Sequence, residues 1–133
     1  MAGPNAPLNW IEQIIKYSIY IGVPREKIVI GLGLYSYDWS DRPMSQSPSN
    51  IINLEWSSNN NLEAGVAYYN KDVEKLLENY SVNSYFDENW GEVVGTYDFQ
   101  GQKRIVIFPS DRSKKKKKKL AADYGIKGIA YWK

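Results

Sequence analysis

Two residue types that carry much of enzyme chemistry are missing from this 133-residue chain, which has no cysteine and no histidine. Without cysteine there can be no disulfide, no thiol nucleophile and no thiolate ligand for zinc. Without histidine there can be no Ser-His-Asp triad, no histidine general base and no histidine metal ligand. Acid–base chemistry would have to use carboxylates, tyrosines or lysines, and we expect no metal and no cofactor.

The chain also lacks a long apolar run. No stretch approaches the roughly 20 residues that a membrane-spanning helix needs. The first four residues, Met-Ala-Gly-Pro, have neither the charged nor the apolar region of a signal peptide. We therefore expect no membrane partner, whereas the compartment stays open because an export signal could have been removed.

Positive charge is concentrated in one place. The formal net charge is +2, and residues 114–119 are six consecutive lysines, without which the chain would be acidic. A surface that is basic overall, as in many nucleic-acid-binding proteins, is therefore not expected. When the helical face of Leu120, Ala121 and Tyr124 is extended backwards, Lys116 and Lys117 fall on its buried side. Their aliphatic stems could lie along the protein surface.

The most informative stretch covers residues 28–39, whose first half is a continuous apolar run with two glycines. Such a run is typical of a strand covered on both faces, as in a parallel sheet. Its glycines permit close packing where a side chain would collide. The second half contains Tyr35, Tyr37, Asp38 and Trp39. This pattern is typical of a strand that delivers a binding site at its carboxyl end, but a core strand with aromatic ends fits it equally well.

The two ends of the chain carry the same pair of elements. Apolar residues recur at helical spacing over residues 8–19, after a capping-box-like start at Asn9 and Glu12. A second helix is predicted over residues 113–124 and a second apolar strand over residues 126–132. Each end is thus half of a βαβ unit. If the two strands are parallel neighbours, six side chains meet at one rim. They are Tyr35, Tyr37, Asp38, Trp39, Tyr131 and Trp132.

The region between these ends predicts a mixture of helices and strands. Residues 40–61 are rich in Ser, Asn and Pro and are interpreted as a long loop. A short helix begins at Asn70, which is a plausible cap. A strand is possible over residues 82–86, and residues 93–99 and 103–108 flank Gly101 as a β-hairpin.

In this order and spacing the motifs resemble the C-terminal part of family 18 glycoside hydrolases, the chitinase-like (β/α)8 barrels, and in particular their spore peptidoglycan hydrolase branch. The resemblance covers nearly the whole chain. Residues 3–10 resemble the loop after the sixth barrel strand, and residues 27–39 the seventh strand. Residues 97–102 and 105–108 resemble the final hairpin of the insertion domain. Residues 111–113 and 120–132 resemble the seventh helix and the eighth strand.

The resemblance implies an α/β fold that forms the C-terminal portion of a (β/α)8 TIM barrel. Residues 1–39 and 110–133 would supply two parallel strands with their helices, and residues 40–109 an α+β insertion subdomain. The resemblance also implies that Trp132 is the floor of a subsite for an N-acetyl sugar. Tyr35, Tyr37 and Trp39 are predicted as further stacking surfaces and Asp38 as an acceptor for sugar hydroxyls. Ordinary structural roles stay open for these residues.

The departures from the family pattern concern catalysis. Family members cleave β-1,4 bonds beside N-acetylglucosamine with the acetamido oxygen of the substrate as nucleophile. Their acid lies in an Asp-x-x-Asp-x-Asp-x-Glu motif. Here Asp38 and Asp41 are followed by Pro43 and Ser45 where the next Asp and Glu would be. The sixth-strand Met-x-Tyr-Asp motif is absent too. Since general acid catalysis contributes about 10²–10⁴-fold, we expect little activity from this chain alone, and whether it is an enzyme stays open.

Three functions stay open. The first is a C-terminal fragment of a family 18-like glycosidase that contacts chitin or peptidoglycan, in an extracellular, cell-wall or spore-associated place. The second is a non-enzymatic carbohydrate-binding or interaction module, whose contact residues could equally be a small core. These residues are Tyr85, Phe86, Trp90 and Tyr97. The third, polyanion binding through residues 114–119, is the weakest, because the run lacks interleaved aromatics. Nucleic acid is therefore not expected as a partner.

A partner of another kind follows from the fold. Two strands cannot close a barrel, which needs eight strands and about 250 residues. Unpaired strand edges favour pairing with another chain. We therefore expect either self-association or a missing N-terminal barrel part.

Overall fold

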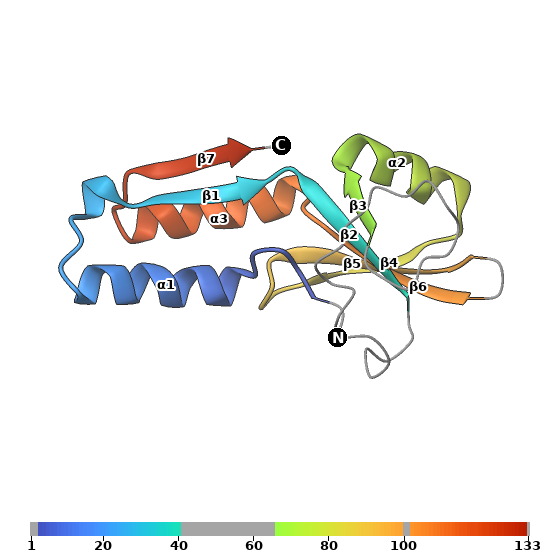
Figure 1. The fold of residues 1–133 in the computed structure, drawn as a ribbon, viewed down its shortest axis with the longest axis horizontal. Coiled ribbons are helices and arrows are strands. Elements are labelled where there is room, and N and C mark those ends of the chain that lie inside the picture. Colours follow the sequence, from blue (N-terminus) through green and yellow to red (C-terminus); the bar gives the residue numbers. More distant parts are fainter. Residues whose placement is uncertain (1–2, 41–65, 100–101, 133) are drawn as a thin grey trace.

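The computed structural model describes residues 3–40, 66–99 and 102–132 of the chain. Two sheets lie end to end in it (Figure 1). One is a parallel pair of strands accompanied by two helices, and the other has five antiparallel strands in the order β3-β2-β6-β5-β4. The fold is therefore mixed α/β. In the described ranges no helix has the length and apolar character required to cross a membrane.

The parallel sheet joins the two ends of the chain. β1 (Val29–Gly33) pairs with β7 (Gly128–Trp132) in the register that places Val29 beside Gly128 and Gly33 beside Trp132. This confirms the prediction that the two apolar segments lie side by side and run in the same direction. α1 (Leu8–Tyr20) and α3 (Asp111–Asp123) lie along the pair (Figure 1), and the short 3-10 turn η1 (Arg25–Lys27) leads into β1.

Aliphatic side chains form the core of this parallel segment. Ile30 and Leu32 alternate with the glycines of β1 and are 6% and 5% exposed, so one face of the strand is buried. Ile11 and Ile15 are four residues apart and therefore share one face of α1. The cluster they form is entirely apolar. It comprises Ile11, Ile15, Ile30, Leu32, Ala121 and Ile126.

The start of α3 is encoded in its own sequence. Ser110 precedes the helix, and its Oγ accepts a hydrogen bond from the Ser113 N–H at 3.2 Å. In return the Ser113 Oγ accepts one from the Ser110 N–H at 2.9 Å. This reciprocal capping box satisfies two amides that a helix terminus otherwise leaves without partners.

The start of α1 depends instead on a distant part of the chain. The capping box predicted from Asn9 and Glu12 is wrong, because the helix begins at Leu8 and has no side-chain cap. The Trp90 carbonyl accepts a hydrogen bond from the Leu8 N–H at 2.8 Å, and the Asn89 carbonyl accepts one from the Asn9 N–H at 3.1 Å. The turn between two later strands thus performs the capping.

The five-stranded sheet is antiparallel throughout. Its strands are β2 (Tyr35–Ser40), β3 (Val66–Tyr69), β4 (Asn83–Asp87), β5 (Glu92–Phe99) and β6 (Gln102–Phe108). β5 and β6 confirm the predicted hairpin. α2 (Asn70–Asn79) confirms the predicted helix, although its cap position is Tyr69 rather than Asn70.

The stretch predicted as a single strand over residues 28–39 is divided between the sheets. β1 ends at Gly33, and β2 begins at Tyr35 in the five-stranded sheet. The division of the chain into a barrel part and an insertion stays a prediction, and β2 pairs with β3 and β6, which fall in the predicted insertion. The predicted loop beyond Ser40 and the hairpin turn at Gly101 lie outside the described residues.

The core of the five-stranded sheet combines apolar and charged groups. Val73 and Leu76 of α2 form a buried cluster with Tyr97 and Val106. Burial extends to the ion pair of Asp38 and Arg104, whose side chains are 0% and 1% exposed. The two halves of the molecule therefore have cores of different chemistry.

Candidate functional site

Trp132 lies on an open face at the end of the parallel pair. In the observed register Gly31 is beside Ala130 and Gly33 is beside Trp132, so these four residues share the face opposite Ile30 and Leu32. A Cβ on Gly31 would lie 3.7 Å from the Trp132 Nε1, which places the indole over the backbone of β1. The Trp132 side chain is 51% exposed. The small residues beside it thus leave room above a flat aromatic surface.

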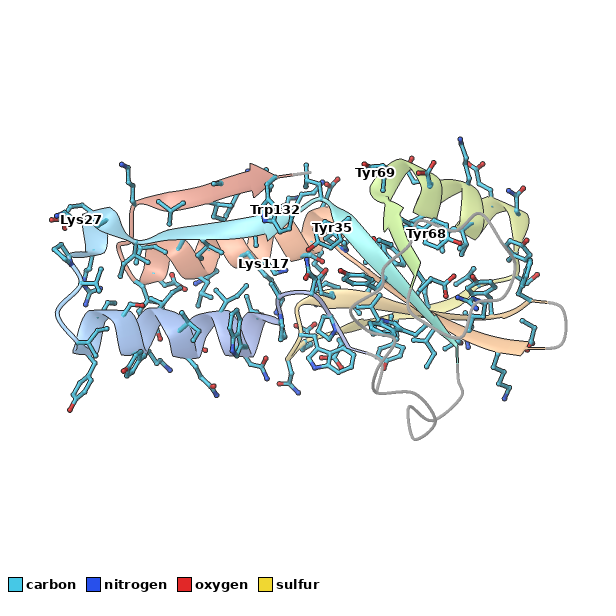
Figure 2. All side chains as sticks on the ribbon, in the orientation of Figure 1. Lys27, Tyr35, Tyr68, Tyr69, Lys117 and Trp132 are labelled. Atoms are coloured by element: carbon cyan, nitrogen blue, oxygen red, sulfur yellow. The ribbon has the colours of Figure 1, made fainter. Side chains whose placement is uncertain are left out.

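Tyr35 brings the second sheet to this tryptophan. The ring centroids of Tyr35 and Trp132 are 5.0 Å apart with the planes at 67°, an edge-on aromatic contact, and Figure 2 shows the two side chains together. The Leu34 N–H donates a hydrogen bond of 2.9 Å to the Trp132 carbonyl. A Cβ at Gly33 would overlap the Tyr35 ring and lie 2.9 Å from the Asn5 Nδ2, so glycine is required for this close approach.

Two further aromatic side chains continue from Tyr35 along β2. The centroids of Tyr35 and Tyr37 are 5.5 Å apart, and those of Tyr37 and Trp39 are 5.6 Å apart. Alternate residues of a strand point to the same face. Trp132, Tyr35, Tyr37 and Trp39 therefore form a continuous line, here called the aromatic row. Burial, and to a smaller extent the neighbouring Tyr35, raises the pKa of Tyr37 above its ordinary value.

Tyr69 extends the row sideways and was missed by sequence reasoning. It is the cross-strand partner of Tyr35 in the pairing of β2 with β3, and its side chain is 43% exposed. Directly opposed residues of antiparallel strands share a face, and Figure 2 shows Tyr69 on β3. The aromatic ending of residues 66–69 was a visible signal, but the strand register that places Tyr69 beside Tyr35 was not.

Asp38 lies on the opposite face of β2 from the row. Its carboxylate accepts hydrogen bonds from the Arg104 Nε at 3.1 and 3.2 Å, and one from the Tyr97 hydroxyl. Burial raises the pKa of Asp38, while the Tyr97 hydrogen bond and the Arg104 charge counteract that rise. Because the side chain is fully buried, the structure gives this carboxylate protein partners and no exposure to a sugar.

Tyr131, the sixth residue predicted at the rim, occupies the other face of β7. It is the register partner of Leu32, which is buried, and its side chain is 42% exposed. It lines a small pocket that also includes Tyr35, Glu92 and Lys117. Tyr131 therefore neighbours the row from behind and is separate from the open glycine face.

The alternative contact set on β4 and β5 does not gather on one exposed surface. Tyr97 is 7% exposed and hydrogen-bonded to Asp38. The Arg112 guanidinium covers the Phe86 ring, 4.1 Å from its centroid. Tyr85, at 59% exposure, is the freely accessible member and points away from Phe86.

The lysine run is paired rather than uniformly free. Four of its ammonium groups contact carboxylates. Lys117, predicted on the buried side of the helix, is buried, whereas the side chain of Lys116, predicted there too, is 34% exposed. The ion pairs are Lys114–Asp111, Lys116–Glu88, Lys117–Glu92 and Lys119–Asp123. Much of the positive charge is therefore neutralised within the chain, which weakens the case for polyanion binding.

The chemistry of the row suits recognition. Tyr and Trp rings offer a flat apolar face and a polar edge, a combination that matches the faces and hydroxyls of a sugar ring. The four rings of the row bring no carboxylate with them, and in the parts of the chain that the structure describes no three acidic side chains gather where a metal ion could bind. The site as described can hold a ligand, and it contains no group positioned as an acid.

Comparisons with known proteins show a family likeness. The model of glycosyl hydrolases family 18 matches residues 1–133. The cortical fragment-lytic enzyme of Bacillus cereus is 28% identical over 134 residues, which span 96% of this chain and 26% of that protein. The chain spans between 26% and 33% of the length of the curated relatives it matches.

Solved structures show the same likeness. The spore cortex-lytic enzyme SleL of Bacillus cereus is 26% identical with a TM-score of 0.73, over 99% of this chain and 28% of that one. The chitinase of Chromobacterium violaceum is 26% identical with a TM-score of 0.77, over 98% of this chain and 35% of that one.

Proposed function

Because this chain belongs to glycosyl hydrolase family 18, we propose that its aromatic row binds a polysaccharide that contains N-acetylglucosamine. Relatives with family 18 chemistry include a chitinase and spore cortex-lytic enzymes, so chitin and peptidoglycan are the two candidate glycans. The observation that carries the proposal is the 5.0 Å contact of Tyr35 with Trp132, which joins the exposed indole of one sheet to the half-buried rings of the other.

Within the row the residues have different parts. Trp132 lies over glycine backbone and is half exposed, so its indole face is the floor on which one sugar ring stacks. Tyr35, Tyr37 and Trp39 follow at an aromatic spacing of 5.0 to 5.6 Å and form one wall of the site. Tyr69 joins this wall, whereas buried Asp38 holds β2 in place from the other face.

We further propose that this chain alone binds its glycan without cleaving it. The sequence contains no Asp-x-x-Asp-x-Asp-x-Glu motif to supply a proton to the leaving group. Substrate assistance removes the need for a carboxylate nucleophile but leaves the need for the acid. Hydrolysis then requires βα units that carry the acid.

We propose that the same missing βα units cover two open surfaces of this chain, the outer edges of β1 and β7 and an apolar stripe along α1. β1 and β7 pair with each other, and the described residues supply no strand for their outer edges. On α1 and at its C-cap the apolar side chains of Ile14, Tyr17 and Ile21 are 43%, 60% and 55% exposed. Their spacing of three and four residues makes one stripe. Since relatives are about three to four times as long as the matched region, the occupant we propose is the rest of a family 18 barrel.

Binding is tested by replacing Trp132. The Trp132→Ala variant should bind chitin oligomers or purified peptidoglycan about three- to tenfold more weakly, since aromatic stacking contributes about 0.5–1.5 kcal/mol. Trp10→Ala is a matched control, because Trp10 is 52% exposed, almost as Trp132 is, but lies on α1. Equal affinity of the two variants would refute the row as the binding surface.

Turnover is tested on the same protein. A chromogenic N-acetylglucosamine oligomer should stay intact with this chain and be cleaved once the remaining βα units of a family 18 barrel are added. Hydrolysis by the chain alone would refute the second half of the proposal. If glycan binding is unchanged in Trp132→Ala but lost in Tyr85→Ala, the alternative function, a carbohydrate-binding module around Tyr85 on β4, is the better explanation.

Light scattering over a range of concentrations tests the partner. We expect the chain to associate with the added βα units, and Ile14→Arg should weaken that association. A compact monomer that stays monomeric when those units are added would contradict the docking surface.

A further inference from the structure

The turn between β4 and β5 is in contact with both helices of the parallel segment. Its residues 87–92 are here called the docking turn. On one side its carbonyl groups cap α1, through the bonds from the Leu8 N–H to Trp90 and from the Asn9 N–H to Asn89. Gly91 has φ +65°, and a Cβ there would lie 3.0 Å from the Leu8 Cβ. The backbone of the turn thus fits closely against the start of α1.

Charged groups attach the other side of the docking turn to α3. Glu88 accepts hydrogen bonds from Arg112 and Lys116, and Glu92 accepts one from Lys117. The two sets differ in burial. The Glu88 side chain is 56% exposed, whereas Lys117 and Glu92 are 5% and 6% exposed. Exposed pairs are screened by water, so the buried pair is the one that constrains the junction.

The buried pair lies directly behind the aromatic row. Glu92 and Lys117 line the same small pocket as Gly33, Tyr35 and Tyr131. The second carboxylate oxygen of Glu92 has no hydrogen-bond partner in the described part of the chain. Burial raises the pKa of Glu92, while the charge and hydrogen bond of Lys117, and to a smaller extent Ser113, counteract that rise.

We infer that Glu92 and Lys117 are positioning residues that hold the five-stranded sheet at the angle at which Tyr35 meets Trp132. The inference rests on the glycan site proposed above. Trp132 belongs to the parallel sheet, whereas Tyr35, Tyr37 and Trp39 belong to the other sheet. Leu34 joins β1 to β2, and residues 109–110 join β6 to α3. The Glu92–Lys117 pair adds a buried side-chain contact between β5 and α3, away from these two chain connections.

This role also explains a lysine within the apolar phase of α3. Ala121 is one turn further along the helix and belongs to the aliphatic cluster, whereas Lys117 reaches the docking turn instead. A buried ammonium group is tolerated because a carboxylate meets it. The pair therefore connects α3 to the docking turn, which an aliphatic residue at position 117 would not do.

Four variants test the inference. Lys117→Met and Glu92→Gln each leave one partner of the pair without its charge complement. Glu92→Leu with Lys117→Met replaces both by apolar groups of similar size, which can pack against each other. Lys119→Met is the matched control, since Lys119 belongs to the same run but pairs with Asp123 on the exposed surface, at 74% and 52% exposure.

Affinity for a soluble chitin oligomer is the first measurement. Lys117→Met should bind about tenfold more weakly than the unaltered chain, and Glu92→Gln should also bind more weakly. The double variant should return to within about threefold, because coupled residues have non-additive effects. Lys119→Met should bind as the unaltered chain does. Equal affinity in Lys117→Met and Lys119→Met, or additive losses in a folded double variant, would overturn the inference.

The angle between the sheets is measured without any glycan. The chain has no cysteine, so Lys103→Cys on β6 and Lys127→Cys before β7 place two spin labels at exposed positions of the two sheets. Their distance distribution should be narrow, broaden in Lys117→Met, and stay narrow in Lys119→Met and the double variant. If Lys117→Met fails to fold, Glu92→Gln replaces it. An unchanged distribution in the folded single variants would overturn the inference.

The two measurements separate the proposals. Absence of glycan binding in the unaltered chain, together with a distance distribution that depends on Lys117, would refute the proposed function and leave the junction role standing for the fold. Binding that depends on Trp132 but is insensitive to Glu92 and Lys117 would refute the positioning role and leave the proposed function intact.

Discussion

The two halves of the molecule differ in what their cores require. The parallel segment is filled by aliphatic side chains such as Ile15 and Ile30, whose attraction has no preferred direction. The five-stranded sheet encloses Asp38, Arg104 and Tyr97, whose interactions depend on distance and angle. An aliphatic core tolerates small shifts between elements, whereas a buried ion pair allows one register of its strands.

This difference explains why the aromatic row follows β2. Ser36 and Asp38 point into the polar core and are 1% and 0% exposed, and the alternate residues Tyr35, Tyr37 and Trp39 form the row. The ion pair to β6 thus holds the rings in register from behind. The predictions below test this contrast between the halves.

Arg104→Met should produce the largest loss of stability. It leaves the Asp38 carboxylate buried without its charge partner, which costs about 3–5 kcal/mol in the free energy of unfolding. Urea denaturation followed by circular dichroism measures the change. Lys103→Met is the control, because Lys103 is the exposed neighbour on the same strand.

A second variant of this pair decides whether the charge itself matters. Asp38→Leu with Arg104→Met removes both charges and should recover most of the lost stability, as buried pairs replaced by apolar groups often do. If Arg104→Met is no less stable than Lys103→Met, the contrast between the two cores is wrong.

Ile15→Ala should destabilise the parallel segment by about 3 kcal/mol, the usual cost of a cavity in a packed aliphatic core. Ile15 is 2% exposed, while its neighbour Ile14 is 43% exposed. Ile14→Ala is therefore the matched control and should cost less than about 1 kcal/mol. Thermal unfolding of both variants provides the measurement, and equal losses would show that α1 does not pack as described.

Tyr97→Phe should cost about 1.5–2 kcal/mol at neutral pH, because a buried carboxylate loses a hydrogen-bond donor. The variant should also change the response to alkali. Burial and the hydrogen bond to Asp38 raise the pKa of Tyr97 above its ordinary value of 10.0.

A folded-state pKa above the unfolded value gives stability that is complete below pH 10 and is lost as the pH rises further. Stability measured between pH 8 and 11 should therefore fall less steeply in Tyr97→Phe than in the unaltered chain. Tyr85→Phe, at an exposed site, serves as the control and should follow the unaltered curve. Identical slopes in all three proteins would contradict the buried hydroxyl.

The sequence predicted the parallel segment better than the sheet, for physical reasons. The apolar run before Leu34, with its glycines, predicted a buried strand of a parallel sheet. The parallel pairing of β1 with β7 confirmed that prediction. The period-two pattern of residues 35–39 was also visible. Which of its two faces is buried depended on the pairing of Asp38 with Arg104. Arg104 is 66 positions away in sequence, and nothing near either residue indicates the pairing.

Contacts between residues far apart in sequence also explain the other predictions that were wrong or incomplete. Helical phase alone placed Lys117 on the buried side of α3, but Glu92 as its partner depends on the position of the docking turn. The start of α1 was wrong because carbonyl groups of that turn replace the expected side-chain cap. Patterns within one element were therefore informative, and contacts between elements were not.

The smallest expected effect concerns α3, which among the described α-helices is the one capped by side chains of its own sequence. Ser110→Ala removes the hydroxyl that accepts the Ser113 amide and should cost about 1 kcal/mol. Ser84→Ala, at an exposed serine of β4, should change stability by less than about 0.5 kcal/mol. Chemical denaturation compares the two. Because the capping box lies within residues 110–113, the cost of Ser110→Ala should be the same in the Arg104→Met background, since sites that share no partner add. A cost that vanishes there would mean that α3, like α1, begins only when the five-stranded sheet is in place.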